Sequence, residues 1–450
     1  MRATQAAIIG KPVHPTVSAP RPWPLLGHLP AFYRDRLGFL DVCAQSETPV
    51  VPLRIGRPTL LLREPADIRF VLQEKPLSFE KTPALTSERG RRLSGNGVLT
   101  SSGDRHRKLR DTLQPLFTRS ALAGFAPFIA ETVLGITRAW RDDAVQNLAV
   151  EMPRLARCIL ARVLFDADYT AQDQALERAF LVRKQYLQYR FDYPFFWSEW
   201  APIPLQVRYW KGRAWIDDYL KKRLERGRET PEGTHLLGRL IATGLDDQEI
   251  CDEAITLAIT GYETMADALM WALWMLAADQ EAQTELRNEA HQVFGDGLPS
   301  AADVARLRFT SMVFSESLRL YPPTWLFLRH TVREERLPSG SRVAVGTKLY
   351  LSPWVVHRDP RFWTRPLCFR PDHFLEEEVA RRPKLAYFPL GAGPRLCLGH
   401  HLAAMEGPLV LSLLAREFDF ARVPNASVRP VGRMTLCAAG PVRVQTRPLR

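Results

Sequence analysis

The stretch "PLGAGPRLCLGHH" (residues 389–401) sets three glycines and two prolines around one cysteine, Cys397, just before an apolar helical pattern. A cysteine thiol becomes an electron-rich, anionic metal ligand when a positive charge, a helix N-terminus or a metal lowers its pKa. Gly391 and Gly393 let the backbone bend tightly and approach a flat, bulky ligand, because neither carries a Cβ. Arg395 adds a cation for an anionic group on that ligand. The stretch therefore predicts a metal-binding loop.

The helix that follows Cys397 strengthens this prediction, since free N–H groups such as that of Gly399 would stabilise negative charge on the sulfur. A single thiolate in such a loop suits heme iron better than zinc, which takes several cysteine or histidine ligands. The alternative is a buried structural cysteine in a glycine-rich turn, which is the usual role of a free cysteine. His400 and His401 are expected to lie at the surface or behind the site rather than to bind the metal.

The composition indicates a globular protein. Of the 450 residues 46% are hydrophobic, so the chain can bury an extensive core. Its six cysteines include no CxxC pair, and a chain of this length needs no disulfides. The most apolar stretch, residues 254–278, is interrupted by Glu263 and Asp267, so we expect no integral membrane anchor. The first 20 residues do not resemble a secretory signal, and we expect a cytoplasmic protein.

The net charge is +12, from 61 lysines and arginines against 49 aspartates and glutamates. Such a balance favours an acidic protein partner, a nucleic acid or an anionic membrane surface. The sequence has no zinc-finger spacing, no aromatic RNA-binding strand motif and no basic tail, so we do not expect nucleic acid as a partner.

The order of the patterns predicts the fold class. Residues 48–65 read as a strand pair with a turn, residues 66–320 are mostly helical, and "RVAVGTKLYLSP" (residues 342–353) is the clearest later strand signal. We therefore expect a mainly α fold with small β-sheets (α+β), as one large domain over residues 20–450 behind an N-terminal extension, residues 1–19.

A long apolar helix is expected over residues 257–274, and it contains the polar stretch "TGYET" (residues 260–264). Thr260 and Thr264 share a helix face, so the Thr264 hydroxyl can bond back to the carbonyl of residue 260. Gly261 would leave a groove on that face. The alternative is an ordinary core helix, with Glu263 exposed or ion-paired and with threonines that only fill space.

The loop "PLGAGPRLCLG" is similar to the heme-binding loop of the cytochrome P-450 family, with Leu390 where that family usually has Phe. The resemblance implies the P-450 fold and a heme b with the Cys397 thiolate as its axial ligand. It places Leu390, Gly391, Arg395 and Gly399 around that cofactor.

The stretch "TGYET" resembles the oxygen-activation motif of the same family, with Thr260 where Ala is frequent. The resemblance implies that Thr264 supports oxygen activation and that Glu263 relays protons. Thr260 and Gly261 would then form the wall of the oxygen site.

The segment "ESLRLYPP" (residues 316–323) places Glu316 and Arg319 one helical turn apart before two prolines. It resembles the family's Glu-Arg lock, whose third member is an arginine. In "FRPDHF" (residues 369–374), His373 takes that arginine's position. We expect a weaker third contact and a pH-sensitive fold or heme retention, because the charge of histidine depends on pH.

Three cationic or imidazole side chains resemble the family's contacts to the heme propionates. His106 and Arg110 lie at i and i+4 in "GDRHRKLRDTLQPLF" (residues 103–117), and Arg329 follows the double proline. Taken singly, each is more often a solvated surface charge.

The expected substrate contacts are mostly apolar side chains, which predicts a hydrophobic substrate. The aromatic segment "QYLQYRFDYPFFWSEWAP" (residues 185–202) resembles the mobile cover of the distal pocket. Its alternatives are ordinary helix packing and shallow contact with a membrane surface. The candidate pocket residues are Leu257, Trp325, Leu326, Phe327, Met434, Thr435, Phe191 and Phe195.

Together these motifs imply a monooxygenase that inserts one oxygen atom from O2 into a terpenoid, fatty acyl or polyketide-like molecule by hydroxylation or epoxidation. The sequence has no GxGxxG motif for a flavin or nicotinamide, so a separate ferredoxin and ferredoxin reductase are expected to supply electrons. One alternative is a peroxide-dependent oxygenase or an O2-independent rearrangement enzyme on the same scaffold. The other is a non-catalytic heme-binding protein.

Overall fold

The computed structural model describes residues 20–140, 144–165, 171–193, 203–229 and 235–449. The larger helices are α2 (Arg36–Ala44), α5 (Glu88–Ser94), α6 (Gly103–Leu113), α8 (Phe125–Thr137), α9 (Leu148–Phe165), α10 (Ala171–Asp192), α11 (Pro204–Glu229), α13 (Asp247–Leu276), α14 (Gln280–Phe294), α16 (Arg308–Leu320) and α19 (His400–Glu417). Shorter helices are α1 (Leu29–Arg34), α3 (Pro65–Arg69), α4 (Pro83–Thr86), α7 (Arg119–Leu122), α12 (Leu236–Ile241), α15 (Ala301–Val304), α17 (Pro353–Val356) and α18 (Glu376–Arg381).

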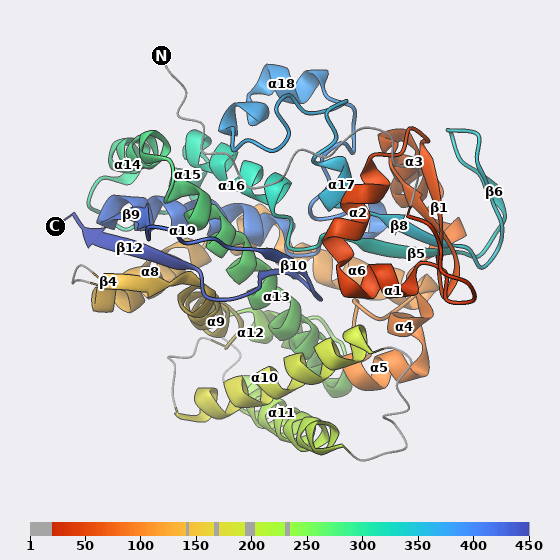
Figure 1. Cartoon of the computed structure of the whole chain (residues 1–450). Helices are drawn as coiled ribbons and strands as arrows, with labels where there is room; N and C mark the ends of the chain where they lie inside the picture. The colour runs from red at the N-terminus through yellow and green to blue at the C-terminus, as the bar shows by residue number, and fades with distance from the viewer. Residues whose placement is uncertain (1–19, 141–143, 166–170, 194–202, 230–234, 450) are drawn as a thin grey trace.

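The strands form small sheets at opposite sides of the helical body (Figure 1). The largest sheet has the order β1-β2-β8-β5-β3, from β1 (Val50–Ile55), β2 (Arg57–Leu62), β8 (Lys348–Leu351), β5 (Phe327–Thr331) and β3 (Phe79–Glu80). A second has the order β4-β12-β9, from β4 (Ala144–Asn147), β12 (Arg443–Pro448) and β9 (Phe418–Arg422). The two remaining pairs are β6 (Glu335–Arg336) with β7 (Arg342–Val343), and β10 (Pro430–Gly432) with β11 (Leu436–Ala438).

Helix α13 crosses the middle of the molecule (Figure 1). It starts at a capping box in which the side chain of Asp246 accepts from Glu249 N, while the Glu249 side chain accepts from Asp246 N. The C-terminal part of the helix, from Met265 to Leu276, is buried on all sides. A helix that is apolar all round belongs in the centre of a protein, so this sequence accounts for its position.

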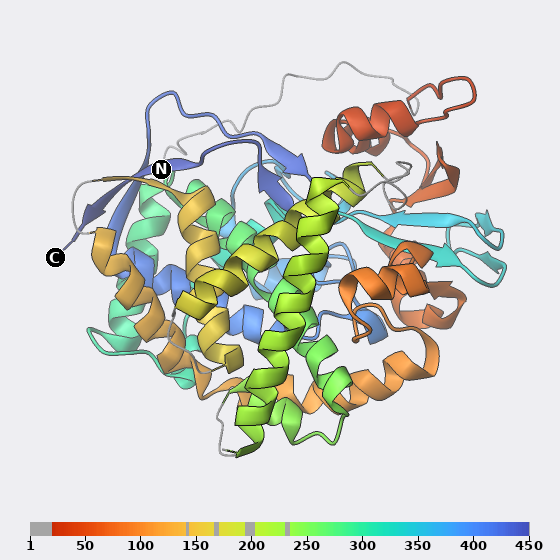
Figure 2. The same ribbon diagram turned by 90° about the horizontal axis from the view of Figure 1, so that it is seen from below.

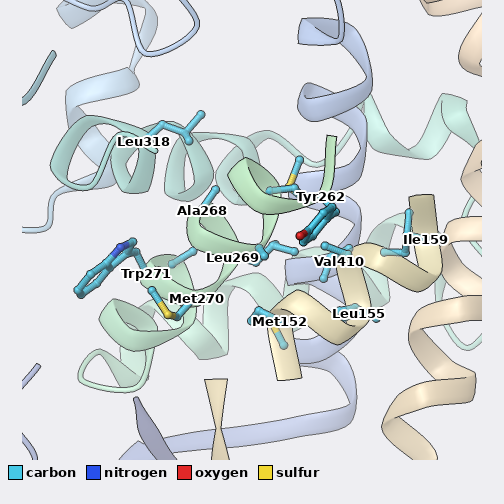
Figure 3. Close-up of a cluster of buried hydrophobic side chains, with 14 of the residues drawn as sticks. Met152, Leu155, Ile159, Tyr262, Ala268, Leu269, Met270, Trp271, Leu318 and Val410 are labelled. Carbon is cyan, nitrogen blue, oxygen red and sulfur yellow. The ribbon is translucent and has the colours of Figure 1, made fainter. Parts of the chain in front are cut away.

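The core beside α13 is formed by α9, α16 and α19. Figure 3 shows Met152, Leu155 and Ile159 of α9 against Leu269 of α13 and Val410 of α19. A Cβ added to Gly261 would lie 3.1 Å from Leu160 Cδ1. Gly261 therefore lets α9 lie close to α13, because a side chain at this position would force the tip of Leu160 to shift.

Helices α10 and α11 lie side by side across one face of the molecule, as Figure 2 shows. The rings of Tyr186 and Tyr209 stack between them with centroids 4.5 Å apart. Of the helices in the described part of the chain, none is both long and apolar enough to span a bilayer.

Candidate active site

The cysteine loop bends as its glycines predict. Gly391 and Gly393 have φ of 75° and 67°, in the left-handed region that favours glycine. A Cβ on Gly393 would collide with the carbonyl oxygen of Leu72, so no larger residue fits there without a backbone shift. The loop closes where Cys397 N donates to Leu390 O at 3.0 Å. His400 Nδ1 lies 2.9 Å from the carbonyl of Cys397, so it supports the loop from the helix side.

The Cys397 thiol has an unusual environment. Burial raises its pKa, while the backbone N–H of Gly399 and the charge of Arg110 act in the opposite direction. The side chain is nevertheless accessible to solvent. A thiol that lies within the protein and faces an interior opening explains both the raised pKa and the solvent accessibility. An axial ligand to a buried cofactor requires this geometry.

The basic side chains predicted around the cofactor come together at this loop. Arg110 Nη1 donates to Leu396 O at 2.7 Å, and Arg395 Nη1 donates to Ser101 O at 2.8 Å. Burial and the charge of Arg395 together lower the pKa of Arg329 to about 10. The hydrogen bonds found here for these guanidinium groups go to backbone carbonyls rather than to carboxylates.

His106 lies in the same cluster. Burial and the charges of Arg395, Lys81 and Arg110 together lower its pKa to about 3. The ring is therefore neutral at physiological pH, and it can serve as a hydrogen-bond donor without adding to the positive charge.

Lys81 is a further basic side chain at this site that the sequence motifs did not reveal. Its Nζ donates to Leu99 O at 2.6 Å. Burial and the charges of Arg395, Arg329 and Arg110 together lower its pKa to about 7. Lys81 directly follows β3, and β3 pairs with β5, which carries Arg329. Only this pairing of distant segments brings the lysine to the site.

The residues at this site fit a heme. Arg329 is buried, and Lys81, Arg110 and Arg395 are half-buried. Cations that repel one another and bind mainly backbone carbonyls have capacity left for an anion, as two propionate groups would supply. The accessible thiol supplies one soft ligand, which suits iron in a porphyrin. Gly399 has open space where a Cβ would lie, and a Cβ on Gly391 would lie 3.4 Å from Phe327.

Replacing Lys81 with methionine is expected to weaken heme binding about tenfold or more, because a hydrogen bond to a charged group contributes about 1.5–3 kcal/mol. The same change should stabilise the heme-free chain at neutral pH, since burial and the neighbouring guanidinium groups oppose the charge of Lys81. The measurements are the rate of heme transfer to an acceptor protein and denaturant unfolding without heme. Lys75→Met, at an exposed position, is the control. Unchanged heme affinity in Lys81→Met would contradict this role.

The polar stretch of α13 forms the predicted back-bond of Thr264, and a second one that was not predicted. Thr264 Oγ1 donates to Thr260 O at 2.9 Å, and Thr260 Oγ1 donates to Thr256 O at 2.8 Å. The Tyr262 hydroxyl donates to Glu263 Oε1 at 3.0 Å, and Glu263 Oε2 lies 3.6 Å from Lys184 Nζ. Glu263 is 10% exposed and Lys184 is 44% exposed, so this pair connects the interior of the helix motif to solvent.

Glu316 and Arg319 form a pair with no exposed side-chain surface. Arg319 Nε and Nη2 each donate to the carboxylate at 2.7 Å, and the remaining donors reach the carbonyls of His357, Pro366 and Cys368. A surface pair at this spacing would contribute only a few tenths of a kcal/mol. The buried network instead joins α16 to the segment before the cysteine loop.

His373 takes the third position of this network. Its Nδ1 lies 3.2 Å from Glu316 Oε1, and its Nε2 lies 2.7 Å from the carbonyl of Thr364. Both partners are acceptors, so only the doubly protonated ring donates to both. Arg382 lies 3.6 Å from the ring centroid of Trp363 and donates to the carbonyl of His373.

His373→Arg is expected to make stability less dependent on pH. A neutral histidine ring has a single N–H, so one of its two acceptors here would face a nitrogen lone pair at a cost of about 1–2 kcal/mol, which the charged ring avoids. An arginine stays charged over this range. The measurements are denaturant unfolding and heme retention between mildly acidic and alkaline buffers. The same pH profile in both proteins would count against this account.

The predicted pocket residues are spread over several environments. Trp325 is 2% exposed, and its Nε1 donates to Arg433 O at 2.8 Å, so it packs as a core residue. Phe327 packs against Gly391 of the cysteine loop, and Phe191 lies under the guanidinium of Arg36. Thr435 hydrogen-bonds Asp267 of α13.

Leu257 and Leu326 are half-buried and pack against the core. Met434 is exposed and borders a small crevice between α10 and α13. Phe195 lies outside the described residues. Asp267, which the sequence shows only as a polar break in an apolar stretch, is buried in α13, and this burial raises its pKa to about 7.

Comparison with known proteins supports the same assignment. The family model for Cytochrome P450 matches residues 17–445. Cyclooctatin synthase of Streptomyces melanosporofaciens is 31% identical over 96% of this chain and 95% of that protein. Cyclooctat-9-en-7-ol 5-monooxygenase of the same organism is 29% identical over 92% of this chain and 91% of that protein.

The fold is similar to that of the cytochrome P450DA heme domain, a solved structure, with a TM-score of 0.84 and 22% sequence identity. The match covers 96% of this chain and 97% of the chain of that structure. The predicted fold, mainly α with small sheets, is thus confirmed. The family model spans nearly the whole sequence, including the cysteine loop, the α13 motif and the Glu-Arg pair. The chain therefore belongs to the cytochrome P450 family of heme-thiolate monooxygenases.

Proposed function

We propose that this protein is a heme b monooxygenase that inserts one oxygen atom from O2 into a C–H or C=C bond of a terpenoid, with Cys397 as the axial ligand. The observation that carries the proposal is the convergence of basic side chains from four separate segments beside the accessible thiol of Cys397. The terpenoid class is favoured by relatives that oxidise terpenoids. We propose residues 20–450 as one catalytic domain behind the extension 1–19, and a cytoplasmic location remains a prediction from the sequence.

Bound heme supplies the activation of dioxygen and the transfer of an oxygen atom. In this proposal Cys397 would hold the iron, and Arg110, Arg329, Arg395 and Lys81 would hold the propionates. The mostly apolar walls of α13 would exclude water from the substrate.

Proton delivery is assigned to α13. The hydroxyl of Thr264 lies on the same helix face as Thr260, and Glu263 lies between the Tyr262 hydroxyl and the ammonium of Lys184. A carboxylate that contacts both an interior hydroxyl and a half-exposed cation can take a proton from solvent and pass it inward. General acid catalysis of this kind contributes about 10² to 10⁴ in rate.

A separate ferredoxin and its reductase are proposed as the electron donors. Helix α6 presents His106 and Arg110 to the site, while Arg107 and Lys108 on its outer side are exposed. An acidic ferredoxin docked on this outer side would lie close to the bound cofactor, and opposite charges would steer its approach.

The test is turnover of farnesol, a terpenoid alcohol, under ¹⁸O2 with NADPH, ferredoxin and reductase, compared with turnover driven by hydrogen peroxide. We expect one ¹⁸O atom in the product, a faster reaction with ferredoxin than with peroxide, and slowing by added salt of the ferredoxin-driven reaction alone. Faster turnover with peroxide would favour the peroxide-dependent alternative. A protein that binds heme but consumes no reducing equivalents with any terpenoid would favour the non-catalytic alternative.

A further inference from the structure

Arg183 of α10 is a buried guanidinium group that the functions assigned above do not use. The residue is 2% exposed, and it lies where α10 meets α11 and α13. Within the described part of the chain, neither its Nε nor its two Nη atoms has a hydrogen-bond partner. Guanidinium groups in protein interiors are normally paired, because leaving one unpaired costs several kcal/mol.

The carboxylates near Arg183 are already engaged elsewhere. Asp217 of α11 accepts from Arg213 Nε at 2.9 and 3.0 Å. Asp252 of α13 lies 3.7 Å from Arg213 Nη2, and burial raises the pKa of its carboxyl group. The hydroxyl of Tyr209 donates to Leu93 O. Arg183 is thus the cation of this cluster that has no direct acceptor.

Burial lowers the pKa of Arg183 to about 10, so the group stays charged at physiological pH. Methionine has a similar volume and would avoid this burial cost, and replacing buried charges with apolar residues is often neutral or stabilising. A purely structural role therefore does not explain an arginine at this position.

Arg183 lies close to the polar motif of α13. It borders a crevice together with Ile259 and Glu263, and Glu263 is next in sequence to Thr264. The charge of Asp252, nearer the start of α13, also acts on Arg183. A group held by Arg183 would thus lie beside the part of α13 to which proton delivery is assigned.

The crevice itself has a volume of about 10 Å³, which is room for one water molecule. A larger ligand therefore requires α10 to move away from α13 locally. A water molecule is the competing occupant, and the experiment must distinguish the two.

We propose that Arg183 anchors the substrate through an oxygen atom that the substrate already carries, with a carboxylate bound most tightly. The planar fork of arginine matches a carboxylate with two parallel hydrogen bonds, whereas a hydroxyl oxygen accepts fewer. The substrate is then a terpenoid already oxidised at one end, so an earlier oxidation of the hydrocarbon must supply it. This inference deepens the proposed function and rests on it.

The probes are farnesene, farnesol and farnesoic acid, which share a carbon skeleton and differ in the terminal group. Their dissociation constants are measured from the spin-state change of the heme-loaded protein and from the shift in its unfolding temperature. We expect the wild type to bind farnesoic acid about tenfold or more tightly than farnesene, with farnesol in between. In Arg183→Met the three constants should agree within about twofold, while farnesene binding stays unchanged.

Two further variants make the result specific. Arg183→Lys keeps the charge but loses the fork, so it should retain part of the preference. Arg208→Met removes an exposed arginine of α11 and should leave all three constants unchanged.

The proposal is overturned if the wild type shows no preference for the oxygenated probes, or if Arg183→Met weakens all three equally. It is also overturned if Arg183→Met raises the unfolding temperature without changing the ligand preference. That result is expected if a water molecule is the hydrogen-bond partner of the Arg183 guanidinium group. Failure of the proposed function itself would appear earlier, as a protein without a heme-thiolate spectrum before any probe is added.

Discussion

Cys397→Ser is expected to lose terpenoid oxidation by more than about 100-fold while the protein remains folded. Mutating residues that merely support a metal ligand typically costs 10–100-fold, so loss of the ligand should cost more. A serine hydroxyl does not provide the electron-rich sulfur on which heme-thiolate chemistry depends. The measurement is product formation with ferredoxin and reductase, with circular dichroism as the check on folding.

Cys368→Ser is the matched control for this variant. Cys368 is also an exposed cysteine, but the hydrogen bonds found for it use its backbone: its carbonyl accepts from Arg319, and its N–H donates to Arg365 O. Its thiol should therefore be dispensable. Retention of more than a tenth of wild-type turnover by Cys397→Ser, or an equal loss in Cys368→Ser, would refute the assignment of Cys397.

Glu316→Gln is expected to lower the free energy of unfolding by about 3–5 kcal/mol and to reduce heme incorporation. Breaking a buried ion pair leaves the remaining charge without compensation, and neither partner here has exposed surface. The carboxylate also accepts from Arg370 N at 2.8 Å and faces His373, so its neutralisation weakens several contacts at once. The measurements are the denaturant midpoint and the heme content of the purified variant.

Glu378→Gln supplies the comparison, because Glu378 pairs with Arg381 at the surface. Exposed pairs contribute about 0–1 kcal/mol, so this variant should be close to wild type. Arg319→Lys, which keeps the charge but loses the planar fork, should fall between the two. If Glu316→Gln proved as stable as Glu378→Gln, the network would not have the structural role given to it.

Contacts set by local spacing could be predicted from the sequence. The hydrogen bond from Thr264 to the carbonyl of Thr260 follows from a separation of four residues in a helix. The left-handed turns at Gly391 and Gly393 follow from the freedom of glycine. In each case the partners lie on one helix or in one loop, so their distance does not depend on the rest of the fold.

Contacts between distant segments could not be predicted in this way. Lys81 reaches the cation cluster only because β3 pairs with β5, and its own neighbours in the sequence form no motif. Arg183 depends on how α10 packs against α11 and α13. The indole of Trp325 donates to Arg433 O and packs against Gly432, which joins residues about one hundred positions apart.

The burial of the Glu316–Arg319 pair illustrates the same limit. The spacing of the two residues predicts the ion pair, but it does not distinguish a surface pair from a buried one. What buries the pair is the segment containing His357, Pro366 and Cys368, whose carbonyls surround the guanidinium. The energetic importance of the pair therefore became evident only from the tertiary structure.

The absorption spectrum of the reduced protein with carbon monoxide tests thiolate ligation by Cys397 most directly. The account predicts a Soret band shifted far to the red in the wild type and absent in Cys397→Ser. A folded, heme-supplemented protein without a heme band, or a wild-type band at the position typical of a nitrogen ligand, would contradict it.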